Sequence, residues 1–155
     1  MITALDTNVL VFIYDRAPHA PELARQLYGL ARNGRLVICG VVYAELLAGP
    51  TRPKPQLDQF LQDVGVELDW EMGEAVWAEA GRANADYHAR RRAGGILRER
   101  PVLPDFLVGA HALHRADRLY TENVADFSDF PSLTVIEAPR LPSVSDTALS
   151  DASLS

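Results

Sequence analysis

The residues best suited to chemistry in this chain are acidic side chains that follow predicted strands. Asp6 comes directly after the first short apolar run, and Glu45 lies about one turn into the predicted helix that follows the second run. Asp105 opens a further predicted helix, and Asp126 comes soon after a late apolar run. In an open parallel sheet, ligands bind outside the carboxyl ends of the strands, and right-handed connections bring those ends to one edge. We therefore expect these acids to lie near one another.

Each of these acids also has a purely structural interpretation. Asp6 could cap a helix, Asp105 could sit at the positive end of a helix dipole, and Glu45 could be a solvated helix residue. That interpretation weakens for the group, because Glu45 is flanked by apolar residues and Asp105 leads an almost wholly apolar helix. Carboxylates that converge on an apolar-walled edge repel one another unless a cation neutralises them.

The chemistry of the expected site follows from its ligand types. No cysteine or histidine pair accompanies the acids in the sequence, so the ligands are hard oxygens, which favour Mg²⁺ or Mn²⁺ over Zn²⁺. A site of this kind typically activates water for in-line attack on a phosphodiester. The residues alone therefore indicate a metal-dependent hydrolase.

The segments that must position these acids are short apolar runs that alternate with amphipathic stretches. The runs predict strands at residues 2–5, 36–39, 66–68, 119–120 and 133–136. The stretches predict helices at residues 9–14, 22–32, 41–47, 57–64, 71–92 and 104–116. This alternation is typical of an α/β fold with a largely parallel sheet. A chain of 155 residues without internal repeats is expected to form one domain with its own core.

The composition is that of a globular protein in a reducing compartment. Apolar residues make up 48% of the chain and charged residues 23%, and the net charge is −6. Cys39 is the only cysteine, which excludes an internal disulfide and a zinc site built from thiolates. The apolar run at residues 9–14 is too short for a signal or membrane segment. We therefore expect a cytoplasmic protein that does not enter a membrane.

Four motifs give the chain a resemblance to a known family: LDTNVLV near the start, YAELLAG after the second strand, LPDFLVGAHAL in the second half and LYTENVADF after it. In this order and spacing they resemble PIN-domain ribonucleases, and specifically the VapC-type toxins of type II toxin–antitoxin systems. The resemblance covers roughly residues 1–138. It implies a three-layer α/β/α fold with a short, mostly parallel central sheet, and an endoribonuclease activity that depends on Mg²⁺ or Mn²⁺.

The resemblance also implies roles for individual residues and partners. The polar residues that the family places beside its metal map onto Asn8 and Thr121. The implied partners are an RNA substrate, a small antitoxin protein whose tail enters the acidic groove, and a second copy of the chain in a homodimer. The implied catalytic acids are Asp6, Glu45, Asp105 and Asp126. Of these, Asp6, Asp105 and Asp126 are implied to hold the metal ion.

The position of the fourth acid stays open between Glu122 and Asp126. The family often has Asp or Asn two residues after a threonine, and here the segment reads Thr121-Glu122-Asn123. Because side chains alternate along a strand, extended backbone would point Glu122 away from the site and return Asn123 to it as a supporting amide. A turn capped by Asn123 would then bring Asp126 over the site, with Phe127 as its apolar anchor.

A basic stretch precedes Asp105. Its arginines are Arg90, Arg91, Arg92, Arg98 and Arg100. They could belong to a solvated helix end, or they could contact RNA phosphates. Because the chain is acidic overall, a concentrated basic patch beside the acids favours the RNA contact. By contrast, Trp70 and Trp77 are expected to pack against other residues rather than stack on bases, and His111 and His114 to be ordinary helix-face residues rather than ligands.

Three other functions fit parts of the pattern. A haloacid-dehalogenase-type phosphatase needs an aspartate two residues after the first, where Asn8 stands. A phospho-receiver domain needs a lysine at a strand end, but the only lysine, Lys54, lies in a proline-rich segment. A PIN fold that binds RNA or protein without cutting stays open, although the intact set of acids argues against it.

The character of the chain changes after Ala138. The segment at residues 139–155 is rich in serine and has no sustained hydrophobic periodicity. Such a composition does not bury enough apolar surface to offset the entropy of ordering the chain. We therefore expect a domain at residues 1–138 followed by a flexible tail, whose removal costs little stability.

Overall fold

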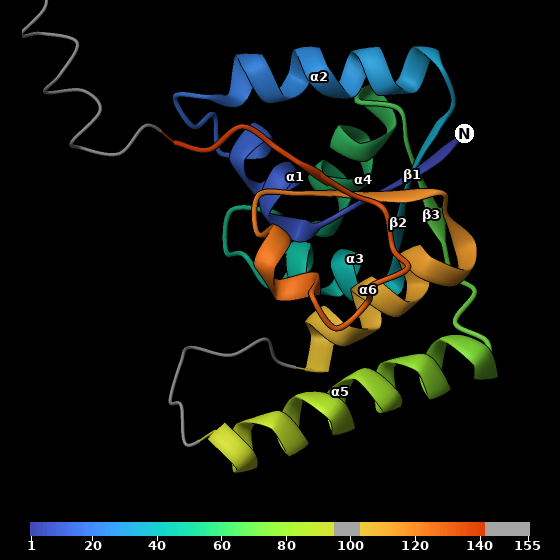
Figure 1. Ribbon diagram of the computed structural model, residues 1–155. Helices are drawn as coiled ribbons and strands as arrows, with labels where there is room; N and C mark the ends of the chain where they lie inside the picture. The colour runs from blue at the N-terminus through green and yellow to red at the C-terminus, as the bar shows by residue number, and fades with distance from the viewer. Residues whose placement is uncertain (95–102, 142–155) are drawn as a thin grey trace, which may run out of the picture.

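The computed structural model describes residues 1–94 and 103–141, and its strands alternate with helices along the chain (Figure 1). Each strand and helix predicted from the sequence has a counterpart, whereas most of the predicted tail lies outside the described residues. The strands are β1 (Ile2–Leu5), β2 (Arg35–Cys39), β3 (Val66–Asp69), β4 (Arg118–Thr121) and β5 (Val135–Glu137). The helices are α1 (Thr7–Tyr14), α2 (Ala20–Arg32), α3 (Gly40–Leu47), α4 (Lys54–Asp63), α5 (Glu74–Gly94) and α6 (Leu103–Arg115), with a short 3-10 helix, η1 (Val124–Phe127).

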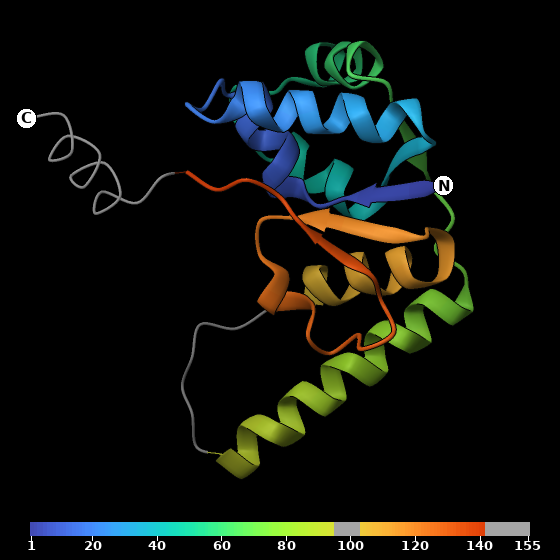
Figure 2. The ribbon, with the colours of Figure 1, turned by 45° about the horizontal axis from the view of Figure 1, so that its top comes forward.

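All neighbouring strands of the sheet run parallel, in the order β3-β2-β1-β4-β5. The inner strands β1 and β2 are buried along most of their length, which explains why their sequences are nearly continuous apolar runs. Helices α1 and α2 lie on one side of the sheet, and α5 and α6 lie on the other (Figure 2). The predicted three-layer α/β/α architecture with a parallel central sheet is therefore confirmed.

The order of the strands reverses next to the central strand, β1. The chain continues from β1 to β2 on one side, whereas β4 pairs with β1 on the other side, so that Ala4 lies between Val37 and Leu119. Such a reversal opens a crevice at the carboxyl ends of the strands, where α/β proteins bind their ligands. Asp6 follows β1 at this point, and its backbone N–H donates a hydrogen bond to the Tyr120 carbonyl at 3.1 Å.

Helix α6 is buried over most of its surface, in keeping with its nearly apolar sequence. The residues from Phe106 to Ala112 are all buried. Gly109 faces the ring of Phe130, and a Cβ at this position would come within 2.4 Å of that ring. This close approach holds α6, whose first turn carries Asp105, against the segment after η1. Among the helices of residues 1–94 and 103–141, none is long and apolar enough to cross a membrane.

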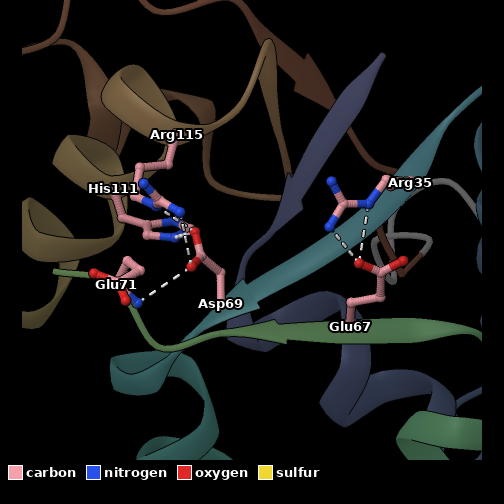
Figure 3. A network of polar contacts seen from close by, with 6 residues as sticks. All are labelled: Arg35, Glu67, Asp69, Glu71, His111 and Arg115. Atoms are coloured by element: carbon pink, nitrogen blue, oxygen red, sulfur yellow. Dashed lines mark hydrogen bonds and ion pairs between the residues drawn. The ribbon is translucent and has the colours of Figure 1, made fainter.

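A polar cluster ties the edge strand β3 to α6 (Figure 3). The Asp69 carboxylate accepts hydrogen bonds from Arg115 Nε at 2.5 Å and from the Glu71 backbone N–H at 3.2 Å, and it lies 3.0 Å from His111 Nε2. Burial opposes the ionisation of Asp69, but these hydrogen bonds outweigh it and lower its pKa to about 2. The expectation that His111 is an ordinary helix-face residue is wrong, because its side chain is buried in this cluster, where burial lowers its pKa.

The Asp69 cluster predicts that acid weakens the fold in a defined pH range. A carboxyl whose pKa is about 2 in the folded protein and 3.8 in the unfolded chain stabilises the fold above pH ~4, and this contribution disappears as the pH falls through ~2. The free energy of unfolding of Asp69→Asn should therefore lie ~1 kcal/mol below that of the wild type at pH 6, and the two should converge near pH 2. Denaturant titrations of both proteins across this range measure the difference.

The ion pair between Glu67 and Arg35 supplies a matched control on the same strand (Figure 3). Both of its side chains are exposed, and exposed pairs contribute little to stability. Glu67→Gln should therefore unfold like the wild type across the whole range. A deficit of Asp69→Asn that stayed constant down to pH 2 would contradict the assignment of its pKa.

Candidate active site

The first acid, Asp6, is buried at the carboxyl end of β1 and accepts several hydrogen bonds. Its Oδ1 accepts from the Thr7 backbone N–H at 2.8 Å, so Asp6 is the N-cap of α1. Its Oδ2 accepts from the Thr121 hydroxyl at 2.7 Å and from Asn8 Nδ2 at 3.3 Å. The helix-cap interpretation of Asp6 is therefore correct, and the same carboxylate is also bound to the end of β4 through Thr121.

Asn8 and Thr121 connect the ends of the two central strands. Asn8 Nδ2 donates to Thr121 Oγ1 at 3.4 Å, and Asn8 Oδ1 accepts from the Glu122 backbone N–H at 3.4 Å. Thr121 Oγ1 also accepts from the Asn123 backbone N–H at 3.0 Å. The two side chains predicted to support the site thus lie beside Asp6 and restrict how its carboxylate can turn.

Glu45 lies on α3 and is held from the start of α1. The Thr7 hydroxyl donates a hydrogen bond to Glu45 Oε1 at 3.0 Å. Burial raises the pKa of Glu45, the hydrogen bond from Thr7 lowers it, and the charge of Asp105 raises it, with a net upward shift. Asp105, in the first turn of α6, therefore lies close enough to Glu45 to act on it electrostatically.

Asp126 lies on η1, beyond the end of β4. Burial raises the pKa of Asp6, and the charges of Glu45 and Asp126 raise it further against the hydrogen bonds that lower it. Burial also raises the pKa of Asp126 itself. The four predicted acids thus form one electrostatic group, in which Asp6 interacts with Glu45 and Asp126, and Glu45 interacts with Asp105.

Glu122, the other candidate for the fourth acid, is directed away from this group. Its buried side chain points towards the junction of α1 and α2, where Oε1 lies 3.3 Å from His19 Nε2. Asn123 supports the turn through its carbonyl, which accepts from the Asp126 backbone N–H at 3.1 Å, whereas its side chain does not cap η1. Alternation along the strand thus predicts the direction of Glu122 correctly, but the expected cap by the Asn123 side chain is wrong.

The donor set of the site suits a hard divalent cation. Its side chains offer carboxylate, amide and hydroxyl oxygens, which Mg²⁺ and Mn²⁺ prefer. Carboxylates that raise one another's pKa gain from a positive charge placed between them. Among the described residues, no three His, Cys, Asp or Glu side chains are at present grouped closely enough to hold one metal ion. A cation would therefore have to draw the acids together.

The arginines predicted to contact RNA differ in their surroundings. Arg90 makes an ion pair with the buried carboxylate of Asp129, and Arg82 donates to the Asp129 backbone carbonyl at 3.1 Å. Both contacts fasten α5 to the segment after η1, so Arg90 has a role in the fold. Arg91 and Arg92 lie in the last turn of α5, and the remaining members of the patch lie outside the described residues: Arg98 and Arg100.

The two tryptophans do not pack into the core. Trp70 lies between β3 and α5 and is 60% exposed, and Trp77 on α5 is 54% exposed. Trp70 meets the ring of Tyr43 edge-on, with ring centroids 5.3 Å apart. The expectation that both side chains serve packing is therefore wrong for most of their surface.

Two contacts beside the site were missed by sequence reasoning. Thr7 holds Glu45, and His19 contacts Glu122, but the partners in each pair are distant in the chain and belong to different elements. The position of Thr7 directly after Asp6 marks it as part of the turn at the site, but gives no sign of its bond to Glu45. His19 has no local signal, since a histidine before a helix is an ordinary surface residue in most sequences.

Comparisons with known proteins agree with the fold and the motifs. The family model described as PIN domain matches residues 3–131 of the chain. Ribonuclease VapC2 from Rickettsia felis is 27% identical over 139 residues, which cover 86% of this chain and 95% of that protein. A similar solved structure is that of VapBC2 from Rickettsia felis, bound to a DNA fragment from the VapBC2 promoter. One of its chains is 25% identical with a TM-score of 0.66, and the match covers 90% of this chain and 100% of that chain. A chain of VapBC-1 from nontypeable Haemophilus influenzae is 24% identical with a TM-score of 0.63, and the match, which covers 88% of this chain and 98% of that chain, supports the fold.

Proposed function

The chain belongs to the PIN-domain family, and we propose that it is a Mg²⁺- or Mn²⁺-dependent endoribonuclease and the toxin of a toxin–antitoxin pair. The observation that carries the proposal is the group of mutually repelling acids at the point where the strand order reverses. Similarity to a protein named ribonuclease VapC2 supports the nuclease activity. A cytoplasmic location belongs to the same proposal.

Three of the acids would hold the cation: Asp6, Asp105 and Asp126. When bound, Mg²⁺ or Mn²⁺ would supply positive charge that polarises a water and the phosphodiester of the RNA. Asp6 is already oriented for this role, because Thr121 and Asn8 hold its Oδ2. These hydrogen bonds reduce the freedom that the carboxylate loses on binding a cation.

Glu45 would accept a proton during cleavage. Its raised pKa brings it nearer to the range in which a general base works at neutral pH. The hydrogen bond from Thr7 holds one carboxylate oxygen and limits the rotation of the side chain. Because Glu45 is exposed enough to meet solvent, a water beside the phosphodiester can pass it a proton.

The proposed partners are RNA, an antitoxin protein and a second copy of this chain. The similar solved structure of VapBC2 supports an antitoxin partner. A protein that blocks an acidic site needs basic side chains to complement it. We therefore expect the antitoxin to place a cationic segment over the acids and to compete there with the metal ion.

Cleavage assays with single variants test which acids take part. Asp126→Asn should lower the rate of Mn²⁺-dependent cleavage of total cellular RNA by roughly 10- to 100-fold, since it removes a charge that acts on Asp6. Asp105→Asn should abolish cleavage. Glu122→Gln is the matched control, because this neighbouring acid points towards His19, and it should cut at close to the wild-type rate. EDTA should stop every variant that cuts.

These assays also separate the proposal from its alternatives. Cleavage at the wild-type rate by Asp126→Asn, together with loss of cleavage in Glu122→Gln, would reverse the assignment of the fourth acid. A wild-type protein that binds RNA but does not cut it with either Mg²⁺ or Mn²⁺ would instead favour a non-catalytic PIN module.

The salt dependence of RNA binding tests the basic patch. We expect Arg91 and Arg92 to contact phosphates, whereas Arg90 acts on the fold through Asp129. In an Asp105→Asn background, replacing Arg91 and Arg92 with Ala should flatten the slope of log affinity against log salt by roughly 1 to 2. Arg90→Ala is the control, and should lower the melting temperature with less effect on the slope. An unchanged slope in the double variant would leave these arginines as a solvated helix end.

A further inference from the structure

A buried contact between a histidine and a glutamate lies behind the candidate active site. His19, between α1 and α2, and Glu122, directly after β4, are 8% and 7% exposed. His19 Nε2 lies 3.3 Å from Glu122 Oε1. A buried carboxylate is costly unless a partner compensates it, so this pair holds two distant parts of the chain together. Neither residue is among those proposed to hold the metal ion or to accept the proton.

The backbone of Glu122 leads directly to the first acid. The Glu122 N–H donates to Asn8 Oδ1 at 3.4 Å, and Asn8 Nδ2 donates to Asp6 Oδ2 at 3.3 Å. The Asn8 amide therefore has its oxygen on the Glu122 backbone and its nitrogen on the Asp6 carboxylate. A shift of the Glu122 backbone would turn this amide and release one of the donors to Asp6.

The histidine side of the contact is itself firmly held. The ring of His19 packs against Phe12 of α1, with ring centroids 4.8 Å apart. The His19 carbonyl accepts from the Leu23 backbone N–H at 3.1 Å, at the start of α2. Within the described residues, neither ring nitrogen of His19 has a hydrogen bond of good geometry, so the contact with Glu122 is the polar interaction available to the ring.

The charges around Glu122 fit a carboxylate that is used for anchoring. Burial raises its pKa, and His19 and Arg140 lower it. The groups that face it are thus cationic or donor groups from the α1–α2 junction and from the segment after β5. None of the acids of the site is among the causes that act on its pKa.

We propose that Glu122 and His19 are positioning residues, which fix the backbone after β4 and so set the Asn8 amide that orients Asp6. The inference rests on the proposed function for its consequence, weaker metal binding when the contact is lost, but not for the contact itself. It accounts for a second acid in this segment that the cleavage site does not use.

The test compares Glu122→Ala and His19→Ala with the conservative variant Glu122→Gln. Two properties of the RNA-free protein are measured. The first is the position of the Asn8 side-chain NH₂ signals in ¹⁵N-resolved NMR spectra, assigned by their loss in Asn8→Asp. The second is the affinity for Mn²⁺ by calorimetry. Asp69→Ala is the matched control, because it removes another acid–histidine contact, with His111, on the edge strand.

Both alanine variants should shift the Asn8 signals and weaken Mn²⁺ binding by roughly tenfold, the lower end of the effect of such supporting contacts. Glu122→Gln keeps an oxygen for the His19 ring and should retain both properties. Asp69→Ala should melt at a lower temperature without moving the Asn8 signals. If Glu122→Ala does not fold, His19→Ala, which leaves the carboxylate free to take up water, decides the matter.

Wild-type Asn8 signals in the folded alanine variants would overturn the proposal. So would a glutamine variant as impaired as Glu122→Ala, because the charge of Glu122 rather than its contact would then matter. A wild-type protein that neither binds Mn²⁺ nor cuts RNA would refute the proposed function, while the Asn8 signals would still decide whether the contact sets the amide.

Discussion

The burial of Asp6 is the constraint on which the rest of the site depends. This carboxylate is 7% exposed, and burial raises its pKa, because an ion removed from water loses hydration worth several kcal/mol. The Thr7 N–H and the Thr121 hydroxyl offset part of that loss. Glu45 and Asp126 add to it, since like charges oppose ionisation. A group of acids arranged in this way is fully ionised at low cost only when a cation accompanies it.

The fold supplies one place where such a group can form. The parallel sheet brings the ends of β1 and β4 together, and the strand order reverses at β1, which is where α/β sheets bind their ligands. Asp6 caps α1, so its charge faces the positive end of that helix. Helix α6, which is buried over most of its length, carries Asp105, and η1, beyond the end of β4, carries Asp126. Rigid elements thus bring together carboxylates that would otherwise separate.

Local signals in the sequence predict the sheet and the acids, but long-range partners escape them. Apolar runs mark parallel strands because such strands are buried on both faces, and Asp6 and Asp126 can be placed by their distance from those runs. The contacts of Arg90 with Asp129 and of His111 with Asp69 join residues far apart in the chain, so charge and periodicity gave the wrong environment for both. The exposure of Trp70 was not predicted for a similar reason. This residue follows β3, and the sequence of that segment does not show that β3 lies at the edge of the sheet.

The dependence of the melting temperature on Mn²⁺ tests most directly whether a cation offsets the repulsion among the acids. We expect Mn²⁺ to stabilise the wild-type protein by about 2.7 kcal/mol at a hundredfold excess over its Kd. Asp126→Asn has one repelling charge fewer near Asp6, so it should melt at or above the wild-type temperature without metal and gain much less from Mn²⁺. An equal gain in both proteins, or a metal-free Asp126→Asn protein that melts well below the wild type, would contradict this account.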